Sequence, residues 1–266
     1  MRAAIVLLAV MLGLCAAPLS AFAQQEAPAH LPENIQIGLS TNRVTITSDF
    51  SGADLTIFGA IDNADAQISR QGGYDVIVVL EGPAQPLVLW RRSRFLGVWV
   101  NAQSQTFVNV PLSYSVATTR APQDITNPDS YKRLSLGTAY IYLEPQERSG
   151  NPATISEFTA ALRDRKLAAG LYSENVGGVQ FLSQTLFRAT LRLPPNVPVG
   201  THKARAFLFR NGEFMKETSS SLAIVKAGFE QTVFRVAHEN SFFYGLFAVA
   251  LAMLTGWMGR LIFRKD

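Results

Sequence analysis

The sequence predicts a mainly β protein that is exported and anchored in a membrane near its C-terminus. Three observations support this fold class: an apolar segment at each end, alternating apolar and polar residues through most of the middle, and turn residues about 8–12 positions apart. The expected fold is two immunoglobulin-like β-sandwich modules, the second with one inserted α-helix. A cleaved N-terminal signal peptide precedes them, and a single C-terminal transmembrane helix follows.

Residues 1–23 have the pattern of a secretory signal peptide. Arg2 is followed by an uncharged apolar run and then by Ala21-Phe22-Ala23, an A-x-A cleavage site. Cleavage after Ala23 removes Cys15, the one cysteine, and leaves a mature chain without a thiol, which suits an oxidising compartment. An uncleaved N-terminal anchor is the alternative, although the apolar run is short for one. Residues 24–33 are expected to form a flexible mature N-terminus.

The first β-sandwich module is predicted over residues 34–120. Its apolar-polar alternation places strands at residues 35–39, 44–47, 55–58, 74–80, 86–90, 96–102 and 106–117. Tyr74 to Leu80 is a nearly continuous β-branched run, which is typical of a strand covered on both faces. A linker is predicted at residues 121–132, which contain two prolines and few apolar residues.

The second module is predicted over residues 133–226. Strands are expected at residues 135–143, 204–210 and 213–217, and Asn211-Gly212 between the last two favours a type I′ hairpin turn. The inserted helix is predicted over residues 155–169, with Thr154 and Glu157 as a capping box and Gly170 as a left-handed C-terminal cap.

Residues 242–263 are predicted to form the transmembrane helix. About 22 residues at 1.5 Å each span roughly 33 Å, enough for a hydrocarbon core of about 30 Å. Arg264 and Lys265, in the tail 264–266, place the C-terminus in the cytoplasm and the sandwich region outside. Residues 227–241 are the juxtamembrane connection. A buried core helix is the alternative interpretation.

Small residues recur three or four positions apart within this span. That spacing keeps them on one helix face, where a second helix can approach closely. We therefore expect a membrane-protein partner or a second copy of the chain to pack there, unless the pattern arose by chance. The five residues are Gly245, Ala248, Ala252, Gly256 and Gly259.

Composition and charge exclude several functional classes. Hydrophobic residues make up 48% of the 266 residues and charged residues 17%, so the chain is too apolar to be disordered. The net charge is +4, of which Arg2 supplies +1 and residues 260–266 supply +2. Because the excess is terminal, it is typical of membrane targeting, and we predict no nucleic-acid partner.

Catalytic motifs are absent, so we predict a protein that is not an enzyme and that needs no cofactor or metal. The histidines are His30, His202 and His238, and no H-E-x-x-H, G-x-S-x-G or phosphate-binding glycine loop occurs. A membrane-anchored enzyme is the least favoured alternative. It requires a cleft that joins His202 to a carboxylate and a hydroxyl.

The exported region contains one basic and aromatic cluster, from Trp90 to Phe95. Its arginines are candidates for binding a carboxylate, phosphate or sulfur oxyanion, with Trp99 as an aromatic wall. A hairpin edge protected by charge is the alternative for the arginines, and a core position is the alternative for Trp99. The candidate ligand residues are Arg91, Arg92, Arg94 and Trp99.

Several short segments of the mature chain also carry a resemblance to a known family. They are residues 92–101 (RSRFLGVWVN), 107–111 (FVNVP), 186–189 (LFRA), 197–201 (VPVGT), 226–230 (KAGFE) and 244–246 (YGL). The chain resembles the alphaproteobacterial transmembrane protein family of the Alph_Pro_TM type. The resemblance implies the inner (plasma) membrane of a Gram-negative bacterium, with the sandwich region in the periplasm. It implies no catalytic residues, and it suggests an exporter of sulfite or another anion as partner.

The function predicted from the sequence is that of a non-catalytic accessory or partner-binding module at the outer surface of the inner membrane. Binding of an envelope polysaccharide or a small anion is the alternative, and a membrane-anchored enzyme is the unfavoured one. Near-neutral charge between the termini supports the first, since residues 3–259 carry 20 basic and 19 acidic side chains.

Overall fold

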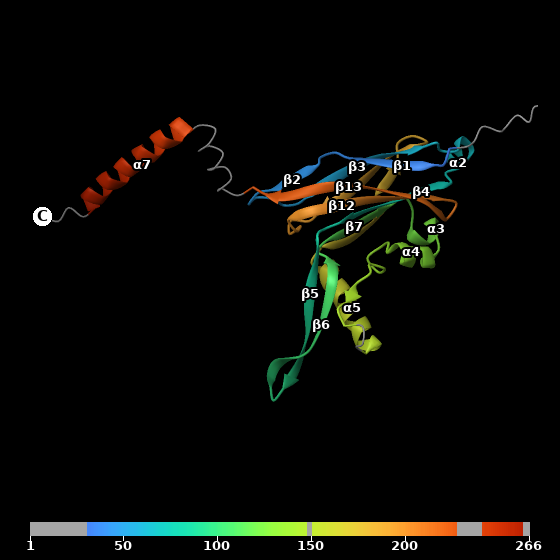
Figure 1. The fold of residues 1–266 in the computed structure, drawn as a ribbon, viewed down its shortest axis with the longest axis horizontal. Coiled ribbons are helices and arrows are strands. Elements are labelled where there is room, and N and C mark those ends of the chain that lie inside the picture. The colour runs from blue at the N-terminus through green and yellow to red at the C-terminus, as the bar shows by residue number, and fades with distance from the viewer. Residues whose placement is uncertain (1–30, 148–150, 228–240, 263–266) are drawn as a thin grey trace, which may run out of the picture. The chain divides into compact units, whose positions relative to one another are not determined.

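The computed structural model describes residues 31–147, 151–227 and 241–262 (Figure 1). The chain divides into two compact units, residues 1–32 and 33–266, and the described helices and strands all belong to the second. The predicted signal peptide (1–23), most of the predicted mature N-terminus (24–33), most of the juxtamembrane segment (227–241) and the tail (264–266) lie outside the described residues.

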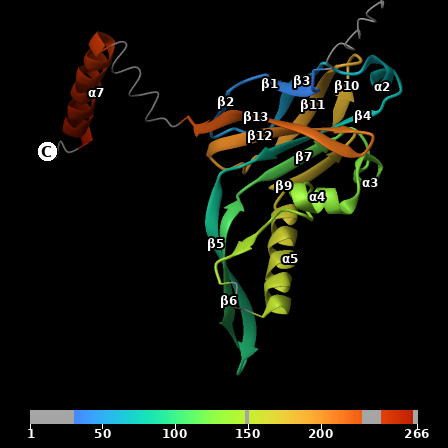
Figure 2. The same ribbon diagram turned by 45° about the vertical axis from the view of Figure 1, so that its right-hand side comes forward.

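Ten of the described strands form a two-layer β-sandwich (Figure 2). Side chains from both sheets meet in one apolar core, which includes Ile57 of the first sheet and Val78 of the second. The first sheet has the order β1 (Asn34–Leu39), β3 (Ala53–Asp62), β11 (Leu186–Leu193), β10 (Val179–Phe181). The second has the order β2 (Arg43–Ile46), β13 (Glu213–Lys226), β12 (Gly200–Arg210), β4 (Tyr74–Glu81), β7 (Tyr114–Thr118), β9 (Tyr172–Val176).

This strand order is immunoglobulin-like. The order β1-β3-β11-β10 corresponds to strands A, B, E and D of such a domain. The order β13-β12-β4-β7-β9 corresponds to strands G, F, C, C′ and C″ of the variable type. One departure is that β9 runs parallel to β7. The prediction of a mainly β, immunoglobulin-like sandwich is confirmed at this level.

The structure differs from the predicted division into modules at 34–120 and 133–226. Strand β11 pairs with β3, and β12 pairs with β4, so strands from the two halves are neighbours in both sheets. The halves therefore build one sandwich. Local alternation predicts where strands lie but carries no information about which distant strand each one pairs with.

Strand β4 is buried on both faces, as its sequence predicts. Val76 and Val78 point into the sandwich core, while Ile77 and Val79 belong to a second core on the outer face of the same sheet. Three helices contribute to that second core: α3 (Pro122–Ile125), α4 (Pro128–Leu134) and α5 (Pro152–Ala168). The outer face of the second sheet is therefore covered at β4 and at the end of β12 that contains Phe207 and Phe209.

The predicted linker at 121–132 forms two of these helices. Ile125 and Tyr131 are buried in the second core, so this segment is part of the domain. Its prolines lie in the first turns of α3 and α4, where a missing N–H costs nothing. Asn127 caps α4 by accepting a hydrogen bond from the Ser130 N–H at 2.8 Å. The prediction of a linker is wrong because Pro122 and Pro128 start helices.

Helix α5 and the hairpin of β12 and β13 form where the sequence predicts them, with one difference in the helix cap. Asn151 caps the helix in place of the predicted Thr154 and Glu157 box, because Pro152 extends the helix by a turn at its start. Gly170 has the predicted left-handed φ, +68°. Asn211 and Gly212 have φ of +49° and +90°, as a type I′ turn requires.

Two predicted strands are replaced by other structure. Residues 135–143 form turns and irregular backbone, with left-handed φ at Ser135 and Gly137, and only Glu144–Pro145 form a short strand, β8. Leu96 and Gly97 have φ of +48° and +85° and form a hairpin turn inside the predicted strand 96–102. The strands on either side are β5 (Ala84–Phe95) and β6 (Val98–Pro111), which form a third sheet with β8.

Helix α7 (Ser241–Ile262) occupies the segment in which a transmembrane helix is predicted. Within the part of the chain that the structure describes, no helix is long and apolar enough to cross a membrane.

Candidate functional site

The candidate site is the hairpin of β5 and β6, which extends away from the sandwich while its base stays within the domain (Figure 1). Phe107 and Val110 of β6 are fully buried in the second core, beside Phe158 and Leu162 of α5. An isolated two-stranded hairpin is marginally stable in water, so this anchored base supports the exposed part.

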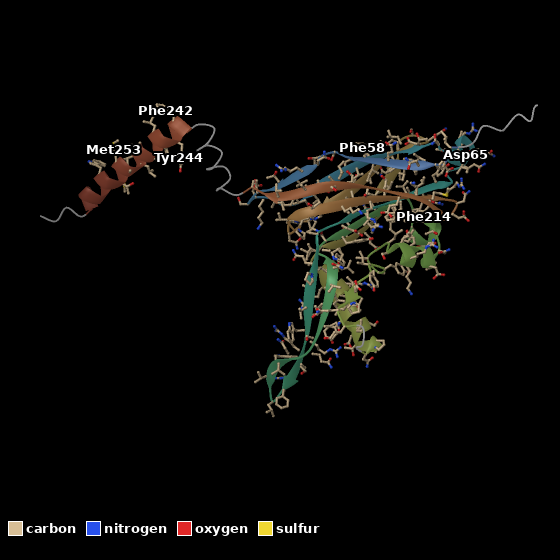
Figure 3. The ribbon with its side chains drawn as sticks, viewed as in Figure 1. Phe58, Asp65, Phe214, Phe242, Tyr244 and Met253 are labelled. Carbon is tan, nitrogen blue, oxygen red and sulfur yellow. The ribbon has the colours of Figure 1, made fainter. Side chains whose placement is uncertain are left out.

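The far end of the hairpin carries an apolar tip, which we define as Phe95, Leu96, Val98 and Trp99. Their exposed fractions are 65%, 89%, 64% and 65%, and Figure 3 shows side chains radiating from this end of the hairpin. Trp99 is therefore exposed and does not lie in the core. Large side chains that are this exposed on adjacent positions mark an interaction surface more often than scattered single ones do.

Strand register distributes the tip over both faces of the hairpin. Arg94 is paired with Trp99 and Phe95 with Val98, and paired residues lie on the same face. Because successive residues alternate between faces, Trp99 lies on one face and Phe95 with Val98 on the other. The tip is thus apolar all round.

The three predicted arginines have different surroundings. The Arg91 guanidinium already has partners within the domain. It forms an ion pair with Glu157 of α5 and donates to Gln103 Oε1 at 3.2 Å. It also lies 5.5 Å from the Phe158 ring centre. Arg94 braces the turn, because its Nε donates to the Gly97 carbonyl at 3.4 Å. These contacts hold the hairpin against α5 and hold the turn in shape.

Arg92 lines an open groove of about 400 Å³ between the hairpin and α5, together with Trp90, Asn101 and Arg165. Among the described residues, neither Arg92 nor Arg165 forms an ion pair. Of the predicted cluster, the structure thus brings Trp90 and Arg92 to this concave surface. Arg165 could not be found from sequence, since nothing local indicates that α5 packs beside this hairpin.

His202 is buried beside Ser113, at the end of the sheet near the hairpin base. The Ser113 Oγ lies 3.2 Å from Nε2, and the Gly200 carbonyl lies 3.3 Å from Nδ1. A carbonyl only accepts, so Nδ1 carries the proton and Nε2 accepts from the serine hydroxyl. A Cβ on Gly82 would lie 2.3 Å from the Ser113 Oγ, which shows how closely backbone covers the pair. Within the described part of the chain, no carboxylate is hydrogen-bonded to this pair, and His202 is fully buried, whereas a catalytic triad needs both a carboxylate and access for substrate.

The His202 environment predicts a pH-dependent stability. Burial lowers the pKa of His202 below its usual 6.5. Between that lowered pKa and 6.5 the unfolded chain binds a proton that the folded domain does not. We therefore expect the free energy of unfolding to be unaffected by His202 protonation above about pH 6.5. Below that pH it should decrease, by at most about 1.4 kcal/mol per pH unit.

Chemical denaturation of wild type and His202→Gln between pH 4.5 and 8 measures this effect. The difference between the two proteins should shrink as the pH falls below 6.5, because only the wild type loses this contribution. A difference that stays constant with pH would mean that His202 does not titrate in this way.

Among the described residues, no three His, Cys, Asp or Glu side chains lie close enough together to hold a metal ion.

On α7, the small-residue face is open within the described structure, since a Cβ added at Gly245, Gly256 or Gly259 meets nothing within 4 Å.

Fold and site together define a class of protein: an immunoglobulin-like β-sandwich that presents an apolar-tipped, arginine-bearing hairpin. The chain belongs to the family described as "Putative transmembrane protein (Alph_Pro_TM)", whose model matches residues 34–265. The resemblance described from the sequence is thereby confirmed.

Solved structures similar to parts of this chain include the following two. One is AggA, the major subunit of aggregative adherence fimbriae type I from Escherichia coli, with 9% identity, 74% of this chain and 99% of that chain covered, and a TM-score of 0.27. The other is domain 1 of VCBP3 from Branchiostoma floridae, with 11% identity, 74% and 98% covered, and a TM-score of 0.27. No curated protein matches the sequence.

Proposed function

We propose that this chain is a single-pass inner-membrane protein whose exported sandwich is a non-catalytic binding module, with the hairpin β5–β6 as its contact element. The observation that carries the proposal is the apolar tip, in which four large side chains are 64–89% exposed on a hairpin that is anchored by the fully buried Phe107 and Val110. Burying such a side chain stabilises a complex by about 1.5–3 kcal/mol, so the tip can supply most of the free energy of a contact.

Anchoring at residues 242–263 is the second part of the proposal. It is supported by the sequence, in which only Arg260 is charged between Ser241 and Phe263, and by the family description. The positive tail keeps the C-terminus in the cytoplasm and the sandwich in the periplasm. The small-residue face of this segment then meets a second helix, either from a membrane protein such as an anion exporter or from a second copy of the chain.

Site-specific photo-crosslinking in native membranes tests both contact elements. A photoreactive residue replaces Trp99 at the tip or Ala252 on the small-residue face. Phe58, which is 44% exposed on the outer face of the first sheet, is the control for the tip (Figure 3). Leu254, on the opposite side of α7 from the small-residue face, is the control for Ala252.

We expect position 99 to form adducts with lipid or protein, resolved by mass spectrometry, and position 58 to form at least several-fold fewer. Position 252 should yield a protein adduct that position 254 lacks. Equal yields at positions 99 and 58 would remove the hairpin from the proposal.

A further inference from the structure

We infer that the apolar tip of hairpin β5–β6 docks onto the phospholipid bilayer that holds the chain, with Phe95, Leu96, Val98 and Trp99 in the interfacial region and the nearby arginines on lipid phosphates. The inference rests on the proposed function, because anchoring is what keeps the bilayer within reach of the domain. Tethering raises the local concentration of the surface, so a weak docking contact is sufficient.

The shape of the tip favours a bilayer over a protein partner. The tip is two strands wide and apolar on both faces, since Trp99 lies on one and Phe95 with Val98 on the other. A folded partner that covers one face leaves the other in water, whereas an interface of lipid headgroups surrounds both. A stable protein contact also buries about 800 Å² on each side, which is more than so narrow a tip presents.

The residue types suit the interface between water and hydrocarbon. Both tryptophans of the exported domain, Trp90 and Trp99, lie on this hairpin and are 58% and 65% exposed. Tryptophan is enriched at the level of lipid headgroups because its ring is apolar while its N–H still needs a polar partner.

Charge on the hairpin is complementary to lipid phosphate. Residues 84–111 contain three arginines and no acidic or other basic side chain, although residues 3–259 as a whole are almost neutral. At about 3.3 Å per residue, Arg94 and Arg92 lie roughly 3 and 10 Å behind Phe95, which matches an apolar tip inserted about 5–10 Å. Arg92 forms no ion pair among the described residues, and Arg94 makes one long hydrogen bond, so both can bind phosphate.

The backbone limits how deep the tip goes. A two-stranded hairpin has N–H and C=O groups on its outer edges without strand partners, and each costs several kcal/mol in hydrocarbon. Docking is therefore shallow and confined to the tip. We therefore expect the tip side chains to lie near the headgroups, a depth that fluorescence quenching can measure.

Single-tryptophan reporters test the inference in the full-length chain. Each variant keeps one native tryptophan, at position 99 or 257, with the other two replaced by phenylalanine. A third variant has all three replaced and carries Phe58→Trp as the control. Each is reconstituted into vesicles of phosphatidylcholine and phosphatidylglycerol at 7:3 with brominated acyl chains, and fluorescence quenching is compared with unbrominated vesicles.

We expect Trp99 to be quenched at least twofold by lipids brominated close to the headgroup and less by lipids brominated near the chain ends. The Phe58→Trp control should be unquenched and freely accessible to acrylamide. Replacing Arg92 and Arg94 by alanine should lower the docked-to-free ratio by about 25-fold, at about fivefold per arginine. Circular dichroism confirms that the variants are folded.

The reporters separate failure of this inference from failure of the proposed function. If Trp257 is quenched while Trp99 stays unquenched and accessible to acrylamide, the chain is anchored and the docking inference is overturned. If Trp257 is also unquenched, anchoring fails and the inference falls with it. If Trp99 is shielded from acrylamide only in native membranes, without quenching by brominated lipid, the hairpin binds a protein, and lipid docking is overturned.

Discussion

Replacing Phe187 with alanine is expected to lower the free energy of unfolding of the exported domain by about 3–5 kcal/mol. Phe187 of β11 is fully buried, and its ring packs directly over Gly59 of β3, where a Cβ would lie 2.2 Å from the ring. Its ring also makes an edge-to-face contact with Phe181, with ring centres 6.1 Å apart. No side chain at position 59 can fill the cavity that the substitution leaves.

The same substitution distinguishes one sandwich from two modules. Because β11 pairs with β3 and shares its core with β4 and β12, destabilisation should spread to strands on both sides of residues 121–132. Hydrogen exchange under denaturant, resolved by mass spectrometry, should show β3, β4 and β12 losing protection together. Leu186→Ala, at an exposed neighbouring position, is the control and should cost less than about 1 kcal/mol. Loss of protection restricted to residues 133–226 would favour separate modules.

Replacing Arg205 with methionine is expected to cost about 2–3 kcal/mol. Arg205 of β12 joins three strands: its Nε and Nη2 donate to Glu217 of β13 at 2.7 and 3.3 Å, and its Nη1 donates to Glu81 of β4 at 3.1 Å. Removal leaves two partly buried carboxylates facing each other. The cost stays below the roughly 3–5 kcal/mol of a fully buried pair, because Glu81 and Glu217 are 28% and 33% exposed.

Electrostatics at this site support that expectation. Burial by itself lowers the pKa of Arg205, but hydrogen bonds and attraction to Glu217 and Glu81 outweigh it and raise the pKa overall. The guanidinium also lies 4.7 Å from the Phe207 ring centre. The charged form is therefore the form that the fold stabilises.

Urea denaturation of the full-length chain in detergent measures the Arg205 effect. Adding Glu81→Gln and Glu217→Gln to Arg205→Met should recover most of the lost stability, because the uncompensated carboxylates are then gone. Lys203→Met, exposed on the same strand, is the control and should change stability by less than about 0.5 kcal/mol. A triple variant no more stable than Arg205→Met would show that packing of the arginine stem, and not charge, is responsible.

Features that depend on a few neighbouring residues could be predicted from the sequence. The turn at Asn211-Gly212 requires positive φ at two positions, and Gly170 ends a helix in the same conformation, so residue type alone indicates them. Tyr74 to Leu80 is apolar at almost every position because both of its faces are covered. The candidate site was predicted in part: the arginines and Trp99 do lie on one exposed hairpin.

Features that depend on distant partners could not be predicted. Pro122 and Pro128 are equally compatible with a linker and with helix starts, and only the apolar face offered by β4 and β12 makes them helical. Arg91 and Arg92 are adjacent in sequence, yet their surroundings differ. Arg91 forms an ion pair with Glu157 of α5, whereas Arg92 lines the groove together with Arg165.

By itself, the sequence determined the mainly β character, the position of most strands and the apolar ends, because the alternation of side chains along a strand is a local property of the backbone. Only the tertiary structure decided that the two halves interleave in one sandwich, and that the hairpin buries its base and exposes its tip. The single sandwich depends on hydrogen bonds and apolar contacts between segments more than 100 residues apart, such as β3 with β11 and β4 with β12. The buried hairpin base depends on its packing against helix α5, which is also distant in sequence.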